Sequence, residues 1–228
     1  MPAIDLLYVD EDVVVADKPS GLLVHRGWDN DDDVAMFRVR DAIGQQVHPL
    51  HRLDRGTSGA LLFARHPEAA RVLSAAFEDG AVEKEYLALV RGQVPEPPDA
   101  NERGEGLIDY PIPRREDGPR VEARTHYQVV ARSPVDRCSL VRARPETGRL
   151  HQIRRHLRHI NHPLVGDVAY GSGAINRHYR ATYALHRLSL HASRLAFAHP
   201  RDGRRIDITA PVPDDLGVPL ERLGLPRP

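Results

Sequence analysis

Short segments in which apolar and polar residues alternate occur along the whole chain, and they constrain its fold more than any other feature. Residues 4–16 predict two strands around an acidic turn, and residues 82–90 and 121–130 show the same period of two. Residues 139–143 supply a neighbouring strand, and residues 183–192, 194–198 and 206–210 predict further strands near the C-terminus. The chain therefore builds its core on a sheet.

Helical segments separate these strands. Residues 34–43 end before Gly44 and follow a run of aspartates, as expected for a capped helix that complements its dipole. Residues 67–78 begin with Pro67 and end before Gly80, with apolar side chains on one side that cover the sheet. Within residues 147–160, one apolar stripe is formed by Leu150, Ile153, Leu157 and Ile160.

The chain is large enough for a substantial core. Its 228 residues with 41% hydrophobic content fit one large domain or two small lobes. No stretch of about 18 uninterrupted apolar residues occurs, and the first residues are acidic where a signal peptide would be basic. We expect a cytoplasmic protein without membrane segments. A single cysteine, Cys138, excludes a disulfide framework and a multi-cysteine zinc site.

Positive charge is concentrated in the C-terminal half. The formal net charge of the chain is zero, yet residues 140–207 carry 13 arginines against four acidic residues, a local charge of +9. Such an asymmetry indicates a localised site for a polyanion such as nucleic acid. Only Lys18 and Lys84 are lysines among the 32 basic residues, which marks them as candidates for places where a compact ammonium is needed.

Asp54 lies in the loop of residues 51–59, which leads into the apolar run 60–64. Arg52 and Arg55 flank the aspartate, and we expect these cations to keep its carboxylate ionised, which suits a nucleophile better than a general acid. By itself this pattern is also that of an ordinary surface turn with ion-paired arginines.

Two other segments carry side chains that fit the same kind of site. On the strand of residues 82–90, Lys84 and Tyr86 share one face, and a flat ring with a polar tip can hold an extruded base. Arg154 falls at the edge of the apolar stripe, so we expect it to point inward and to need a buried anion. Asp54 is the partner that we predict for it.

These segments together resemble the RluA-type pseudouridine synthases. The resemblance rests on the sequences HRLDRGTSGALLFA from His51, KPSGLLVH from Lys18, KEY from Lys84, TGRLHQIRRHLRHINHPLVGD from Thr147 and LHASRLAF from Leu190. It implies an α+β catalytic domain with a mixed, mostly antiparallel central sheet, flanking helices and loops, and no N-terminal S4-like domain. Residues 1–228 would form this single domain, with two lobes at roughly 1–94 and 120–228 joined by the Pro/Gly-rich excursion 95–119.

The resemblance also implies roles for particular residues. Asp54 would be the nucleophile, acting at the ribose C1′ or through a glycal, while Tyr86 stacks on the target base and Arg154 pairs with Asp54. Because a base within a stem must be flipped out, Arg52 would fill the vacated space. The remaining residues expected at the substrate are Lys18, Lys84, Arg149, His151, Gln152 and Leu190.

Weaker features favour the tRNA-directed branch of the family, which modifies position 65. They are residues 24–28, 45–47 and 170–183 and the pair Arg154–Arg155. Ribosomal RNA is the competing substrate, and a non-catalytic RNA-binding module is the alternative from another class. A metal-dependent nuclease is disfavoured because the histidines near Arg154 scatter around the helix. We expect a monomer that needs neither metal nor cofactor and binds RNA but no membrane.

Overall fold

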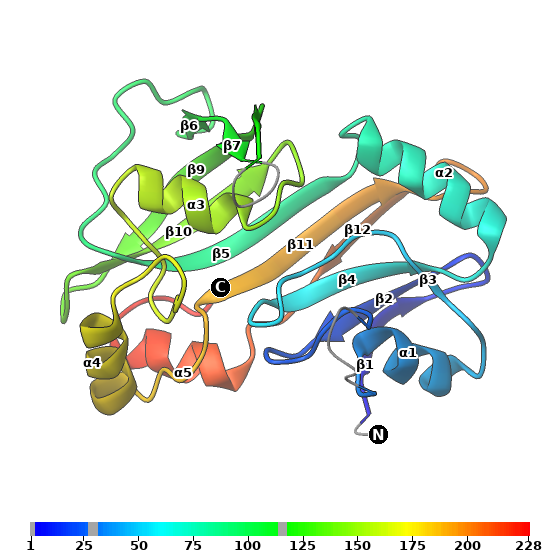
Figure 1. Cartoon of the computed structure of the whole chain (residues 1–228), viewed down its shortest axis with the longest axis horizontal. Coiled ribbons are helices and arrows are strands. Elements are labelled where there is room, and N and C mark those ends of the chain that lie inside the picture. Colours follow the sequence, from blue (N-terminus) through cyan, green and yellow to red (C-terminus); the bar gives the residue numbers. More distant parts are fainter. Residues whose placement is uncertain (1–2, 27–31, 114–117) are drawn as a thin grey trace. The chain divides into compact units, whose positions relative to one another are not determined.

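The computed structural model describes residues 3–26, 32–113 and 118–228, and these form two compact units (Figure 1). Unit 1 contains residues 1–84 and 192–211, and unit 2 contains residues 85–191 and 212–228. The elements of unit 1 are β1 (Asp5–Val9), β2 (Val13–Lys18), α1 (Ala35–Ile43), β3 (His48–Pro49), β4 (Ser58–Ala64), α2 (Pro67–Glu78), most of β11 (Leu190–Ala198) and β12 (Arg205–Thr209).

Unit 1 is built on a sheet that α2 covers. The strands follow the order β1-β2-β4-β11, with β12 on β11 and β3 on β4. All seven residues of β4 are buried, as expected for a central strand. Leu73 of α2 joins a core with Val13, Leu62 and Phe197, and α2 lies along β4. This buried strand gives the loop before it a rigid support.

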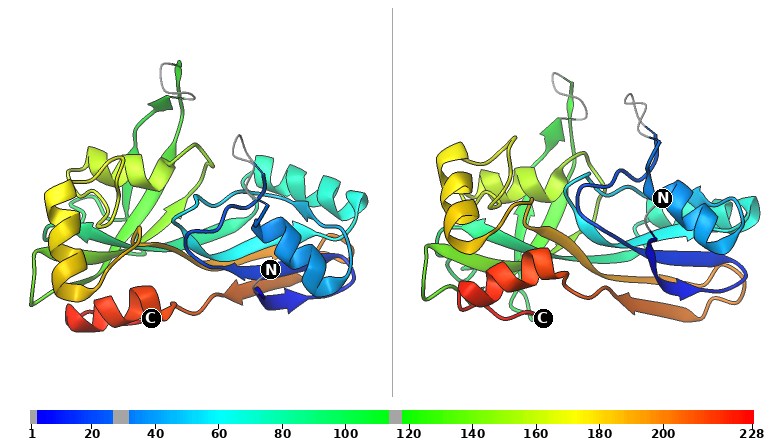
Figure 2. Two further views of the ribbon diagram at one scale, coloured as in Figure 1. Left: turned by 60° about the horizontal axis from the view of Figure 1, so that its bottom comes forward. Right: turned by 90° about the horizontal axis from the view of Figure 1, so that it is seen from below.

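Unit 2 contains four strands of the ten-stranded sheet, paired antiparallel, and three helices. Its strands follow the order β5-β10-β9-β6, and α3 lies across β9 and β10 (Figure 2). Tyr179 and Tyr183 of α4 join Leu216 and Leu220 of α5 in its core. The elements are β5 (Glu83–Arg91), β6 (Gly106–Asp109), β7 (Ile112–Pro113), β8 (Arg120–Val121), β9 (Arg124–Arg132), β10 (Cys138–Pro145), α3 (Gln152–His159), α4 (Gly173–Tyr183) and α5 (Asp214–Arg222).

The α+β class with a mostly antiparallel sheet is confirmed, and several elements lie where the sequence predicts them. The strands on both sides of the acidic turn are β1 and β2, and α2 has the predicted bounds. Gly44 ends α1 in the left-handed conformation, and its N–H bonds the Arg40 carbonyl. Cys138 is buried in β10 as a free thiol.

Other segments differ from the prediction. The strand expected over residues 183–192 begins only at Leu190, because Tyr179 and Tyr183 are spaced four apart and pack together on α4 with ring centroids 5.4 Å apart. Leu150 precedes α3 and is 40% exposed, so it does not belong to the apolar stripe.

The Pro/Gly-rich excursion also differs from the predicted joint between lobes. It lies within unit 2, where β6 pairs with β9 and β7 pairs with β8. The chain passes between the units inside β5, inside β11 and after Pro211. No helix in the described part of the chain is long and apolar enough to cross a membrane.

Candidate active site

Asp54 begins a tight turn at the start of β4. The Thr57 N–H donates to the Asp54 carbonyl at 2.9 Å, and the Asp54 side chain is half-buried. Gly59, two residues into the turn's outgoing strand, has a φ of +108°, and a Cβ there would lie 2.8 Å from the Ala192 backbone nitrogen. The aspartate is therefore held by a strand that passes too close to β11 for any side chain at Gly59.

Lys18 ties this turn to the segment after β2. Its side chain is fully buried, and its ammonium donates to the carbonyls of Pro19 at 2.9 Å, Leu22 at 2.7 Å and Arg55 at 3.3 Å. The backbones add to this contact, since the Gly21 N–H donates to the Arg55 carbonyl at 2.8 Å. A guanidinium could not make three such bonds from one point, which explains a lysine in this arginine-rich chain.

His51 fixes the other side of the Asp54 loop. Its Nε2 accepts the Leu62 N–H of β4 at 3.0 Å, and its ring stacks on Phe77 of α2 at 5.0 Å. Burial, together with the nearby Lys84 ammonium, lowers the pKa of His51 to about 3. The imidazole is therefore neutral, as its acceptor role requires. Nothing in the sequence around His51 by itself predicts this contact.

Lys84 lies beside the same aromatic side chain. Its ammonium is 5.9 Å from the centroid of the Phe77 ring, and burial lowers the pKa of this lysine. Arg52, near the beginning of the loop, is exposed to solvent. Unit 1 thus brings together Lys18, Arg52, Asp54 and Lys84 among the predicted site residues.

Tyr86 and Leu190 belong to unit 2. Tyr86 is 9% exposed and faces Ala143 of β10 in the ladder, whereas its neighbour Leu87 enters the core with Leu89. The tyrosine is thereby on the opposite face of β5, as the alternation predicts. Leu190, the first residue of β11, is 4% exposed.

Arg154 points inward from α3 and is only 8% exposed, as predicted. Its Nε and Nη2 bind both carboxylate oxygens of Asp167 at 2.7 and 2.9 Å. Burial opposes the charge on Asp167, but Arg154 and the N–H groups of Tyr170 and Ala169 outweigh it and hold the pKa of Asp167 below its ordinary value. This buried, bidentate pair fixes the plane of the guanidinium.

Sequence reasoning missed Asp167. A signal was available, because Asp167 is the only acidic residue between Glu146 and Asp202 in a segment rich in arginine. The same carboxylate also accepts the N–H groups of Ala169 and Tyr170, so it orders the turn after α3 as well. The predicted pairing of Arg154 with Asp54 of unit 1 stays a prediction.

Three other predicted residues around α3 make contacts within unit 2. Gln152 is 5% exposed and bonds Thr147, the Arg149 N–H and two acceptors on β9, so its amide is fully used. His151 has a φ of +54° and its Nδ1 lies 3.0 Å from the Tyr170 hydroxyl. Arg149 is exposed and donates to the Glu122 carbonyl at 3.1 Å.

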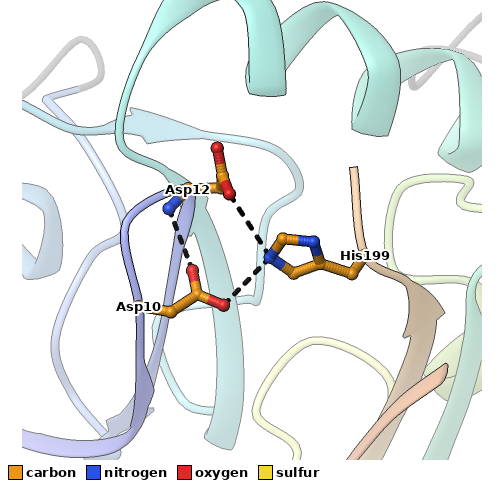
Figure 3. Close-up of side chains that lie close together, drawn as sticks. All are labelled: Asp10, Asp12 and His199. Carbon is orange, nitrogen blue, oxygen red and sulfur yellow. Dashed lines mark hydrogen bonds and ion pairs between the residues drawn. The ribbon is translucent and has the colours of Figure 1, made fainter. Parts of the chain in front are cut away.

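Asp10, Asp12 and His199 form the cluster in the described residues that could hold a metal ion (Figure 3). Their possible ligand atoms lie within 4.8 Å of one another. All four carboxylate oxygens, however, already accept from protein donors, among them Arg201 and Arg204. The cluster therefore acts as an ion-pair network that joins the turn after β1 to the turn after β11.

An α+β fold that holds an aspartate on a clamped turn, in a chain whose residues 140–207 carry a charge of +9, fits an enzyme that acts on a nucleic acid. The family model described as RNA pseudouridylate synthase matches residues 12–159. The chain belongs to this family, whose members are isomerases that convert uridine to pseudouridine in RNA.

Proteins and structures similar to this chain agree with that assignment. The chain is 41% identical to "tRNA pseudouridine synthase C" of Pasteurella multocida, over 92% of this chain and 91% of that protein. It is 42% identical to the protein of the same name from Haemophilus ducreyi, over 91% of this chain and 90% of that protein. The structure of "Human RNA Pseudouridylate Synthase Domain Containing 4" is similar with a TM-score of 0.76 at 26% identity, covering 98% and 94% of the two chains.

Proposed function

We propose that this enzyme isomerises one uridine of tRNA, at position 65, with Asp54 as its nucleophile. The names of the relatives at 41% and 42% identity support tRNA as the substrate, because the similarity extends over nine-tenths of both chains. The observation that carries the proposal for Asp54 is the support of its turn. Lys18 donates to the carbonyls of Leu22 and Arg55, and His51 accepts the Leu62 N–H of β4. The carboxylate is half-buried there and can meet an extruded nucleotide.

The reaction needs no group donor. The bond between uracil N1 and the ribose C1′ breaks, a bond forms between C5 and C1′, the C5 proton leaves and N1 gains a proton. Asp54 would take the sugar at C1′ or remove a proton to give a glycal, and either route requires the ionised carboxylate. No metal or cofactor enters these steps, and we propose that a monomer performs them.

The other predicted residues would hold the flipped base. Tyr86 would stack on it and relay the C5 proton, Leu190 would contact its apolar edge, and Arg154 would orient the Asp54 carboxylate. Arg52 is exposed and long enough to fill the space that the base leaves in the stem. The remaining contacts to the RNA would come from Lys18, Lys84, Arg149, His151 and Gln152. A cytoplasmic location, where tRNA is found, goes with this proposal.

Replacement of Asp54 by asparagine tests the role of the carboxylate. Asp54→Asn should abolish pseudouridine formation on a tRNA transcript, measured by release of tritium from C5-labelled uridine, and should leave RNA affinity within about threefold because the side chain keeps its shape. Asp41→Asn is the matched control, since Asp41 is exposed on α1 and pairs with Arg40 of the same helix. Retained activity in Asp54→Asn would refute the assignment, whereas RNA binding without product from the wild type would favour a non-catalytic RNA-binding module.

A further inference from the structure

A pocket of about 470 Å³ lies in unit 2 at the end of β5, and no step of the proposed reaction uses it. Arg91 ends β5, Arg137 precedes β10, and Asn161 and His162 follow α3. Tyr86 lies five residues before Arg91 on the same strand, which places the pocket about 17 Å from the predicted base-stacking ring. A separate binding event could therefore occur here while the base is held at Tyr86.

The walls of this pocket are held by backbone hydrogen bonds. The Gly92 N–H donates to the Arg137 carbonyl at 2.7 Å, and the Arg91 N–H donates to the Pro163 carbonyl at 2.9 Å. His162 donates from Nδ1 to the Arg91 carbonyl at 2.8 Å, which leaves Nε2 for other contacts. Gly92 has a φ of +88°, and a Cβ there would lie 3.0 Å from the His162 ring, so the close approach requires glycine.

The charges around the pocket favour an anion. Arg91 and Arg137 are both exposed, and neither side chain has a carboxylate partner among the described residues, although ion pairs occupy many other arginines of the chain. Asp136 is the acidic residue of the lining, and its two oxygens bind the Arg137 N–H at 2.6 Å and His178 at 2.7 Å. The partial negative charge at the end of α3, about half an elementary charge, is smaller than that of two guanidinium groups.

We infer that this pocket binds a phosphate group of the RNA backbone outside the nucleotide that is modified. Two guanidinium groups on a rigid frame, with the Asn161 amide beside them, offer several N–H donors to one phosphate, and phosphate contacts of this kind fix register without reading sequence. A metal cation would be repelled. The inference rests on the RNA substrate proposed above and adds a second point of attachment on the same strand as Tyr86.

The salt dependence of tRNA binding tests this inference. Each contact to a phosphate contributes about one unit to the slope of log Kd against log salt concentration. Arg91→Gln and Arg137→Gln should each reduce the slope by about one unit, weaken binding about three- to tenfold at 100 mM salt, and leave kcat at saturating tRNA within about twofold. Arg91→Lys should keep the slope, because it keeps the charge.

Arg71→Gln serves as the matched control. Arg71 is an exposed arginine of α2 that also lacks a carboxylate partner among the described residues, and its replacement should leave the slope unchanged. Slopes equal to the wild-type value in both pocket variants, with normal unfolding midpoints, would overturn the inference while the proposed function stands. Absence of tRNA binding by the wild-type protein would overturn both.

Inorganic phosphate distinguishes the RNA backbone from a small anion as the ligand. If the pocket served a free anion, millimolar phosphate would raise the unfolding midpoint of the wild type but not of Arg91→Gln, and the salt slope for tRNA would not differ between them. That result would contradict the inference. The inference predicts a changed salt slope for tRNA in Arg91→Gln, whether or not phosphate alone stabilises the wild type.

Discussion

The Asp54 turn of unit 1 and the Arg154 helix of unit 2 position charged side chains in different ways. A lysine ammonium that bonds three neutral carbonyls holds the turn, whereas a complete ion pair with Asp167 holds Arg154. In unit 1 the Lys18 ammonium binds backbone carbonyls, and Asp54 lies at the beginning of the turn. In unit 2 one carboxylate fixes the guanidinium and also orders the turn after α3. One segment is thus held through backbone carbonyls and the other through a side-chain ion pair.

The largest effect is expected where β4 supports the Asp54 turn. Gly59→Ala would push a methyl group into the Ala192 backbone of β11, which cannot move aside as a flexible side chain could. Gly59 also has a positive φ, which an alanine adopts only with strain. We expect a loss of more than about 4 kcal/mol in unfolding free energy, measured by urea denaturation, or failure to fold. Gly203→Ala is the control, because Gly203 has a φ of +72° but open space around it, and should cost about 1 to 2 kcal/mol. Similar losses in both variants would show that the close approach to β11 is unimportant.

Removal of the anion in unit 2 should have the next largest effect. Asp167→Asn removes the Asp167 charge from its bidentate pair with the buried Arg154 guanidinium, which should destabilise the protein by about 3 to 5 kcal/mol and lower kcat as the guanidinium loses its orientation. The exposed pair offers a control, since Asp109→Asn breaks only the contact to Arg124 and should cost less than about 1 kcal/mol. A variant of Asp167 as stable as that of Asp109 would remove the contrast between buried and exposed pairs.

The two lysines give a direct test of the ammonium in unit 1. Lys18→Met removes the ammonium from the carbonyls of Pro19, Leu22 and Arg55, of which the buried Leu22 carbonyl loses most, and should destabilise the protein by about 2 to 4 kcal/mol, with a fall in activity because the Asp54 turn loosens. Lys84→Met is the matched control, because burial already disfavours that ammonium and its contact is a ring face; its unfolding free energy should change by less than about 1 kcal/mol. Equal losses would mean that both lysines serve only as packing.

A smaller effect is expected from pH through His51. Its pKa lies at about 3 in the folded protein, below the ordinary value of 6.5, so the unfolded chain binds a proton that the folded one does not. The contribution of His51 is complete above about pH 6.5 and is lost as the pH falls toward 3, with a slope of at most about 1.4 kcal/mol per pH unit. His51→Gln keeps an acceptor for the Leu62 N–H, and its unfolding free energy should fall less steeply over this range. An unchanged slope would exclude His51 as the source.

The part of the fold that depends on local pattern could be predicted from the sequence. The helix at residues 67–78 follows from Pro67 and Gly80, and the inward direction of Arg154 follows from its place beside Ile153 and Leu157. The loop of Asp54 could be singled out because its motif is long and specific. Each of these inferences needs only neighbouring residues.

Contacts that depend on tertiary structure could not be predicted in the same way. The three acceptors of Lys18 are backbone carbonyls, which every residue carries, so no side chain identifies them in advance. The role of Asp167 as the partner of Arg154 depends on the fold of the turn after α3, although its isolation among arginines is visible in the sequence. The helix α4 was missed because two tyrosines supply its buried face in an otherwise polar segment.

Mapping of pseudouridine at single-nucleotide resolution tests the central claim most directly. Cellular RNA would be compared from cells with the gene, cells without it, and cells that carry either the wild type or Asp54→Asn. We predict that one tRNA position, 65, loses its pseudouridine without the gene and regains it only with the wild type. Loss of a ribosomal RNA site with intact tRNA, or restoration by Asp54→Asn, would contradict the account.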